Sequence, residues 1–191
     1  MMMNMAFFVF SLLIADVAFS MSIYRVDFAG PSPIWYTPTM VEHSGHLIRS
    51  YYEKSGGKEL VPLSLLESDP VAAAKELFFL PSRVVVSHGI QCGSDGPIMN
   101  YGNNAALQRW AASWEQMTTM HSKYTAEPML QAEREEFLRR VLTDGIINDY
   151  VGVRISLDKS RFRMLDGSVW NIDVNGKRIG QAATFSKWDD L

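Results

Sequence analysis

The chain has 191 residues, of which 47% are hydrophobic and 20% are charged, and its 18 Lys and Arg against 21 Asp and Glu give a formal charge of −3. This composition excludes a disordered chain and is sufficient for the core of one globular domain. The mildly acidic balance, without a run of basic residues, argues against a nucleic-acid partner. The single Cys92 excludes an internal disulfide and cannot by itself make a cysteine-based zinc site.

The first segment, residues 1–20, has the features of a signal or targeting peptide. An apolar run from Ala6 to Ile14 is followed by the small residues Ala18 and Ser20 at the positions that precede a cleavage site. The run is too short for a stable membrane span. We therefore expect this segment to direct the protein to the secretory pathway. A plastid is the other expected destination, because Ala18 precedes a Phe as in two-part algal plastid presequences. A membrane anchor or a misassigned start remains open, and without a functional segment the protein would be cytoplasmic.

A linker and two helices are predicted next. Residues 21–37 are rich in Pro and Gly, so we expect a linker there and a domain over residues 38–191. Apolar residues at helical spacing predict a helix from Thr39 to the Gly56-Gly57 pair. A second helix is predicted to begin at Asp69-Pro70, an N-cap followed by a first-turn proline, and to run to Pro81.

The middle of the chain changes to a strand pattern and then back to a helical one. The β-branched run Arg83–Ser87 and the segment Ile98–Tyr101 predict a hairpin. Asn104 is a candidate cap for a helix that extends to Trp114. The longest helix is predicted to begin after Thr125 and to end at Gly145, a C-terminal glycine signal.

Everything after this helix is strand-like. Ile147, Val151, Val153 and Ile155 alternate with polar residues and Tyr150, and a second strand is expected over Arg161–Ile172. Asn175-Gly176 predicts a tight hairpin turn into the last strand. The order of elements indicates an α+β fold: a PAS-like five-stranded antiparallel sheet with helices on one face and extra N-terminal helices.

The chain also resembles a known family. In chain order it carries the motifs VVVSHG, PIMNYGNNAAL, YTAEP, AEREEFLRRV, DYVGVRIS, SVWNI and GQAATFSKW. As an ordered set these motifs resemble the MEKHLA domain, a PAS-related family found as free-standing proteins and at the C-terminus of plant homeodomain-leucine-zipper factors. The similarity extends from about Thr37 to Leu191, with departures at His121-Ser122-Lys123 and Gly93-Ser94. It implies a sensing or interaction module without an established enzymatic activity.

Several side chains are expected to point into the fold. His88 is in phase with Val84 and Val86, and Gln181 shares a face with Ile179, Ala183 and Phe185. Trp170 is in phase with Phe162 and Met164 if no bulge occurs at Asp166-Gly167. Each could contact a ligand, or could be an ordinary core residue whose polar atoms find partners in the protein. The candidate lining of a small cavity is His88, Tyr101, Trp110, Arg154, Trp170 and Gln181.

No metal or flavin adduct is expected. His43 and His46 lie three residues apart on the first helix and would supply only half of a metal site. Cys92 lies in the predicted hairpin rather than on the helix from Asn104, where flavin-adduct photoreceptors carry their reactive cysteine. The cofactor is unknown, and the common nucleotide, zinc-protease and hydrolase motifs are absent.

The leading hypothesis is a non-enzymatic PAS-like sensory or regulatory module that binds a small molecule, a partner protein or a second copy of itself. The first alternative is an enzyme of unrecognised type that uses His88 as an acid or base in the cavity. The second is a purely structural interaction domain whose core is filled. Neither a nucleic-acid partner nor a stable membrane span is expected.

Overall fold

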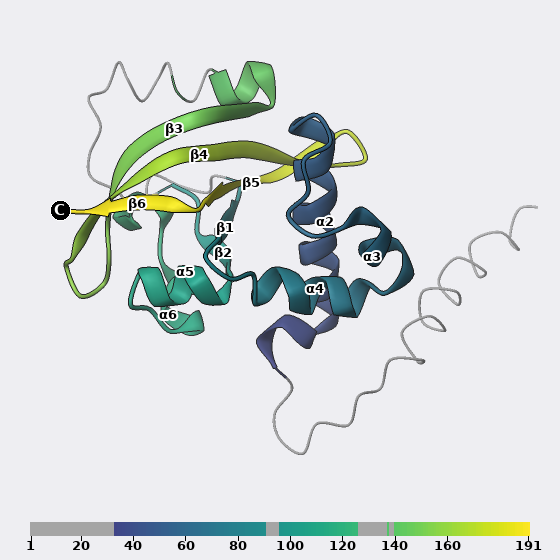
Figure 1. Ribbon diagram of the computed structural model, residues 1–191, viewed down its shortest axis with the longest axis horizontal. Helices are drawn as coiled ribbons and strands as arrows, with labels where there is room; N and C mark the ends of the chain where they lie inside the picture. The colour runs from purple at the N-terminus through teal and green to yellow at the C-terminus, as the bar shows by residue number, and fades with distance from the viewer. Residues whose placement is uncertain (1–32, 91–95, 126–136, 138–139) are drawn as a thin grey trace, which may run out of the picture. The chain divides into compact units, whose positions relative to one another are not determined.

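The computed structural model of the protein describes residues 33–90, 96–125, 137 and 140–191 (Figure 1). The predicted targeting segment 1–20, most of the linker and Cys92 lie outside the described residues. Trp35–Leu191 form one structural unit. Among the described residues, no helix has the length and apolar character needed to cross a bilayer.

Four helical segments begin this unit: the short 3-10 helix η2 (Ile34–Tyr36), α2 (Pro38–Lys54), α3 (Leu63–Ser68) and α4 (Pro70–Phe78). The Thr37 side chain caps α2 by accepting from the Met40 N–H, and the Asp69 carboxylate caps α4 by accepting from the Ala72 N–H, as the Asp-Pro signal predicted. The short α3 was not predicted.

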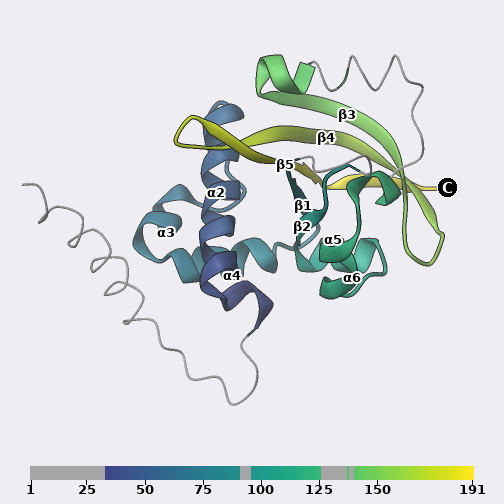
Figure 2. The same cartoon turned by 180° about the vertical axis from the view of Figure 1, so that it is seen from behind.

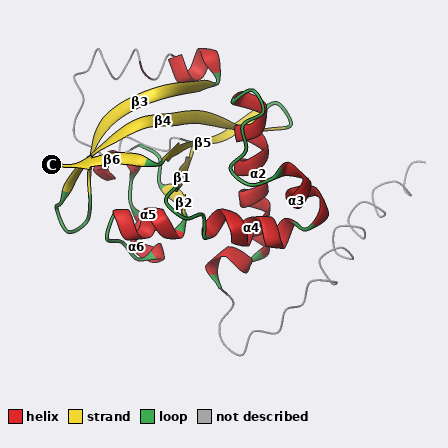
Figure 3. Cartoon of the chain, in the orientation of Figure 1, coloured by secondary structure: helices red, strands yellow, loops and turns green. Residues whose placement is uncertain are grey.

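The strands of the sheet are β1 (Val84–Gly89), β2 (Met99–Gly102), β3 (Ile146–Ile155), β4 (Arg161–Val174), β5 (Lys177–Phe185) and β6 (Lys187–Asp190). The sheet is antiparallel throughout, with strand order β2-β1-β5-β4-β3, and it confirms the predicted PAS-like α+β class (Figures 1 and 3). The sixth strand, β6, which the sequence did not predict, also pairs with β4.

The single helix predicted from Asn104 to Trp114 is wrong, because the chain breaks there into α5 (Asn104–Arg109) and α6 (Trp114–Thr119). Ala111 takes a positive φ of 48° between them, and Ser113 starts α6 with a capping box. The cap of α5 is Asn103 rather than Asn104, since its Oδ1 accepts from the Ala106 N–H. The 3-10 helix η3 (Ser122–Thr125) follows α6.

Two separate cores cover the two faces of the sheet. The first core joins the sheet to α2, α3 and α4, and Figure 2 shows these helices grouped together beside the strands. The second core lies on the opposite face under α5 and α6. Residues of the first core include Leu47, Tyr51, Leu77, Val85, Tyr101, Trp170 and Ile172. Residues of the second core include Val84, Val86, Trp110, Met117, Tyr150, Phe162 and Phe185.

A bulge in β4 reverses the predicted direction of Trp170. Asp166 takes a positive φ of 49° next to Gly167, so the alternation of side chains shifts by one residue. Phe162 and Met164 therefore belong to the second core, whereas Trp170 belongs to the first. The common face was predicted for a strand without a bulge at Asp166-Gly167, and because the bulge is present these three residues do not share a face.

The alternation predicted for β3 is also wrong. Its register with β4 shifts on both sides of Tyr150, and Asp149 takes a positive φ of 61°. As a result Tyr150 joins Ile147 in the second core, while Val151 is 53% exposed. Strand β3 therefore presents to the second core a tyrosine that the simple pattern placed on the polar face.

Two predicted element ends can be compared with the structure, namely the glycine that ends the long helix predicted after Thr125 and the turn that follows β4. Most of the long helix predicted after Thr125 lies outside the described residues, but residues 140–144 are helical. Gly145 follows them with φ of +75°, as expected at a helix C-terminus. The turn at Asn175-Gly176 is confirmed, because φ values of 50° and 74° are those of the hairpin turn that this pair favours.

Candidate functional site

A cavity of about 160 Å³ lies on the second-core face of the sheet. Strands β1, β3, β4 and β5 supply one wall, and Trp110 after α5 and the segment around η3 supply the other. This volume is below the roughly 300–1,000 Å³ of pockets that bind drug-sized ligands, so the cavity suits only a small molecule. Its polar lining residues are Ser87, His88, Ser122, Lys123, Thr125, Tyr150, Arg154 and Gln181.

His88 lies on the cavity wall because β1 continues to Gly89, which keeps it in phase with Val86 as predicted. Its Nδ1 lies 2.8 Å from the Gly89 carbonyl oxygen. A carbonyl can only accept, so Nδ1 carries the proton and Nε2 is left as an acceptor in the neutral ring. Burial lowers the pKa of His88, although the Gly89 carbonyl partly opposes the shift. The ring is therefore neutral at pH 7.

Gln181 lies directly across from His88 in the β1–β5 ladder. Its Nε2 donates to the Asn171 Oδ1 at 3.0 Å, and the Asn171 Nδ2 donates to the Val141 carbonyl at 2.9 Å. The side chain is half-buried and lines the cavity together with Ala183. This chain of bonds within the protein fixes the orientation of the Gln181 amide.

Arg154 supplies a positive charge to the cavity. Its Nη1 donates to the Val153 carbonyl at 3.0 Å and its Nη2 donates to the Tyr150 hydroxyl at 3.3 Å. The guanidinium carbon lies 5.3 Å from the centre of the Tyr150 ring, within cation–π range. Among the described residues no carboxylate pairs with Arg154, unlike Arg109, which pairs with Asp190.

Trp110 provides the aromatic part of the lining. Its ring meets Phe162 edge to face at 5.2 Å and Phe185 at 6.1 Å, and all three are buried in the second core. The indole Nε1–H is buried and has no hydrogen-bond partner within the described part of the chain. The cavity thus combines an apolar aromatic wall with a few placed polar groups, which is the usual composition of a small-molecule site.

Comparison with known proteins identifies the family. The family model of the MEKHLA domain matches residues 41–190. The chain belongs to the MEKHLA family. No curated protein sequence matches it.

Solved structures with PAS and light-oxygen-voltage (LOV) domains are similar to this MEKHLA domain. An RNA-binding Light-Oxygen-Voltage receptor is 13% identical over 70% of this chain and 35% of its own, with a TM-score of 0.50. The PAS domain of a protein from Colwellia psychrerythraea is 12% identical over 64% of this chain and 98% of its own, with a TM-score of 0.46. The photo-excited blue-light photoreceptor Vivid is 10% identical over 56% and 78% of the two chains, with a TM-score of 0.43. Such identities are informative about the fold alone.

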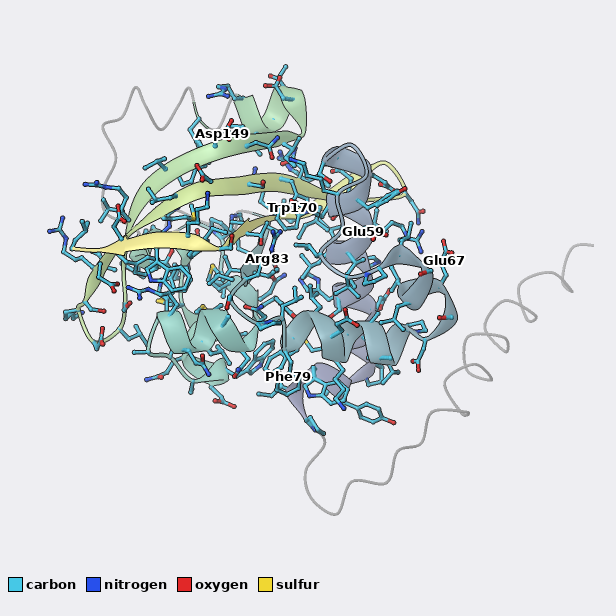
Figure 4. All side chains as sticks on the ribbon, viewed as in Figure 1. Glu59, Glu67, Phe79, Arg83, Asp149 and Trp170 are labelled. Carbon is cyan, nitrogen blue, oxygen red and sulfur yellow. The ribbon has the colours of Figure 1, made fainter. Side chains whose placement is uncertain are left out.

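Two of the predicted cavity residues of the MEKHLA domain lie on the other face of the sheet. Trp170, labelled in Figure 4, is fully buried in the first core, where its Nε1–H donates to the Ser50 Oγ at 3.0 Å and its ring meets Tyr51 at 4.9 Å. Tyr101 is also fully buried there, beside the Ser44 hydroxyl but outside hydrogen-bond geometry, and burial raises its pKa. Neither residue lines the cavity, so both are core residues.

His43, considered as half of a metal site, has a different role in the structure. Its Nε2 lies 2.8 Å from the Ser87 Oγ, and that hydroxyl donates to the Asn100 Oδ1 at 2.7 Å. The His43 Nε2–H is therefore the donor to Ser87, and the bond ties α2 to β1. Burial, with a smaller contribution from His46, lowers the pKa of His43 to about 4. Among the described residues no group of three His, Cys, Asp or Glu side chains is placed to hold a metal.

Several lining residues were not predicted from the sequence. Tyr150 was missed because the bulge at Asp149 changes its face. Ser122, Lys123 and Thr125 lie in η3, which has no apolar periodicity. The one available signal was the position of Thr125 inside the motif YTAEP.

Proposed function

We propose that this MEKHLA domain is a non-enzymatic, PAS-like sensory or regulatory module that binds a small ligand in the cavity on the second-core face. The observation that carries the proposal is the pairing of His88 with Gln181 on adjacent strands, both lining a space that the surrounding aromatic side chains leave open. A site with convergent polar groups and an apolar wall is the default place for a ligand in a fold of this kind.

Strand β1 supplies a physical route from the cavity to the surface. Its side chains alternate, so that His88 faces the cavity, whereas the hydroxyl of Ser87, a residue that also lines the cavity, is bonded to His43 of α2 on the other face of the sheet. If β1 can shift between two placements, a ligand that binds one of them more tightly would also favour the placement of α2 that goes with it, because the two elements are bonded to each other. The expected output is a ligand-dependent contact of the helical face with a partner protein or with a second copy.

The arrangement supports binding better than catalysis by His88. The ring is oriented by a backbone carbonyl rather than by a carboxylate, which would raise its basicity. Within the described part of the chain, no other hydrogen bond to the His88 ring is present. Its pKa is lowered, so at neutral pH it has little capacity to deliver a proton.

The test is native mass spectrometry of the full chain, combined with a thermal melt and a ligand-observed NMR screen of small fragments. Three proteins are compared: the wild type, Gln181→Leu at the cavity, and the control Gln108→Leu on the exposed side of α5. We expect a bound small molecule that stabilises the wild type and Gln108→Leu and is weakened or lost in Gln181→Leu. A wild type that retains no molecule and binds no fragment would overturn the proposal.

A further inference from the structure

The charge of the cavity is unusual for a buried site. Arg154 and Lys123 both line it, whereas no Asp or Glu among the described residues does. Arg154 is half-buried and forms no ion pair in the described part of the chain. Partial burial of a charge costs free energy unless an opposite charge or hydrogen bonds compensate it. The protein therefore maintains an incompletely compensated cation beside an open space.

The hydrogen bonds of Arg154 leave it able to bind an anion. Nη1 and Nη2 each use one N–H, on the Val153 carbonyl and the Tyr150 hydroxyl respectively. Each terminal nitrogen keeps a second N–H, and the Nε–H has no partner in the described residues. The two existing bonds also fix the plane of the guanidinium. Its position is set in advance, which reduces the entropy lost when an anion binds.

We infer that the cavity binds a small organic carboxylate whose two oxygens accept from Arg154 and whose apolar body packs against Trp110, Met164 and Phe185. This inference rests on the proposed function and names the ligand class of the same site. Planar carboxylates match the fork of a guanidinium in a bidentate pair, which is stronger than a bond to a neutral acceptor. The aromatic and thioether side chains favour a ligand with an apolar body over an inorganic ion.

The test uses matched probe pairs on the full chain at constant ionic strength. Benzoate and propionate are compared with benzamide and propionamide, which have nearly the same shape without the charge, and sulfate and phosphate are added as inorganic anions. Binding is measured by calorimetry and by the shift of the melting temperature. We expect a carboxylate of the panel to bind and raise the melting temperature, whereas its amide and the inorganic anions do so at least about tenfold more weakly.

The variants assign the effect to Arg154. Arg154→Gln is expected to weaken carboxylate binding by about 10- to 100-fold, because it removes a charged hydrogen-bond donor pair. Arg154→Lys keeps the charge without the fork, so its affinity should lie between those of the wild type and Arg154→Gln. The control is Arg163→Gln, an exposed arginine on β4, which should bind as the wild type does. Circular dichroism establishes that each variant is folded.

The remaining outcomes separate the inference from the proposed function. Amides that bind as well as carboxylates, or an unchanged affinity in a folded Arg154→Gln, would overturn the carboxylate assignment and leave a ligand-binding module. Sulfate or phosphate binding as tightly as the carboxylates would also overturn it, because the site would then select charge alone. If the wild type retains no molecule and binds neither these compounds nor the fragments, the inference and the proposed function both fail.

Discussion

Replacing Trp170 separates a core role from a ligand-binding role, because its position predicts a large effect on stability and none on the cavity. The side chain is fully buried in the first core, contacts Tyr51 and donates to the Ser50 Oγ. Trp170→Ala should cost about 3–5 kcal/mol, the range for truncation of a large buried aromatic. For a domain of this size, this corresponds to a fall in melting temperature of roughly 6–20 °C.

The assay is urea denaturation with a thermal melt, on the wild type and on Trp170→Ala and Trp170→Phe. The Phe variant keeps much of the buried surface and removes the N–H donor to Ser50, so we expect a smaller loss of about 1–2 kcal/mol. Tyr124→Ala is the exposed control, since its side chain is 60% exposed and should matter by less than about 1 kcal/mol. A loss below about 1 kcal/mol in Trp170→Ala would refute the assignment of Trp170 to the core.

Three further changes have defined expected results. In the folded protein the pKa of His43 is lowered from 6.5 to about 4. Between these two pH values the unfolded chain binds a proton at His43 that the folded protein does not bind. The free energy of unfolding is therefore highest above pH 6.5 and falls by about 3 kcal/mol as the pH drops to 4. Melts of His43→Gln should show a flatter pH dependence over that interval, and an unchanged slope would contradict the reasoning. Gly176→Ala should cost about 1 kcal/mol in urea denaturation, because φ is +74° and an added Cβ meets no atom, leaving only the backbone strain; a stabilised variant would contradict this. Asn103→Ala should cost about 2–4 kcal/mol by the same measurement, because Oδ1 accepts from the N–H groups of Val85 and Ala106 and Nδ2 donates to the Arg83 carbonyl. A neutral result would show that water replaces these bonds.

The fold was predictable where the chain carries strong local signals. The Asp69 cap and the Asn175-Gly176 turn depend on neighbouring residues only, so they could be located without knowledge of the tertiary structure. Helix α3 and strand β6 are too short to show a period. The break between α5 and α6 depends on Ala111 taking a positive φ, which its residue type does not suggest.

The site was predictable only in part, because bulges decide which face a residue occupies. His88 and Gln181 lie on segments whose alternation with Val86 and Ala183 is regular, and both line the cavity. Trp170 follows the irregular residues at Asp166, and Tyr150 follows those at Asp149. A single inserted residue exchanges the two faces of a strand, so no count of alternating positions can place residues beyond it.

The strand order also determines when the sheet can be completed during synthesis. Strand β1 lies between β2 and β5, and its ladder with β5 joins Val84 to Phe185 near the other end of the sequence. The Thr184 hydroxyl donates to the Val84 carbonyl across the same gap. Contacts of such long separation form slowly, and the entropic cost of closing the loop is offset only by contacts that need both strands. In a nascent chain, one edge of β1 therefore stays unpaired until β5 has left the ribosome. The meander of β3, β4 and β5 is then the last part of the sheet to pair with β1.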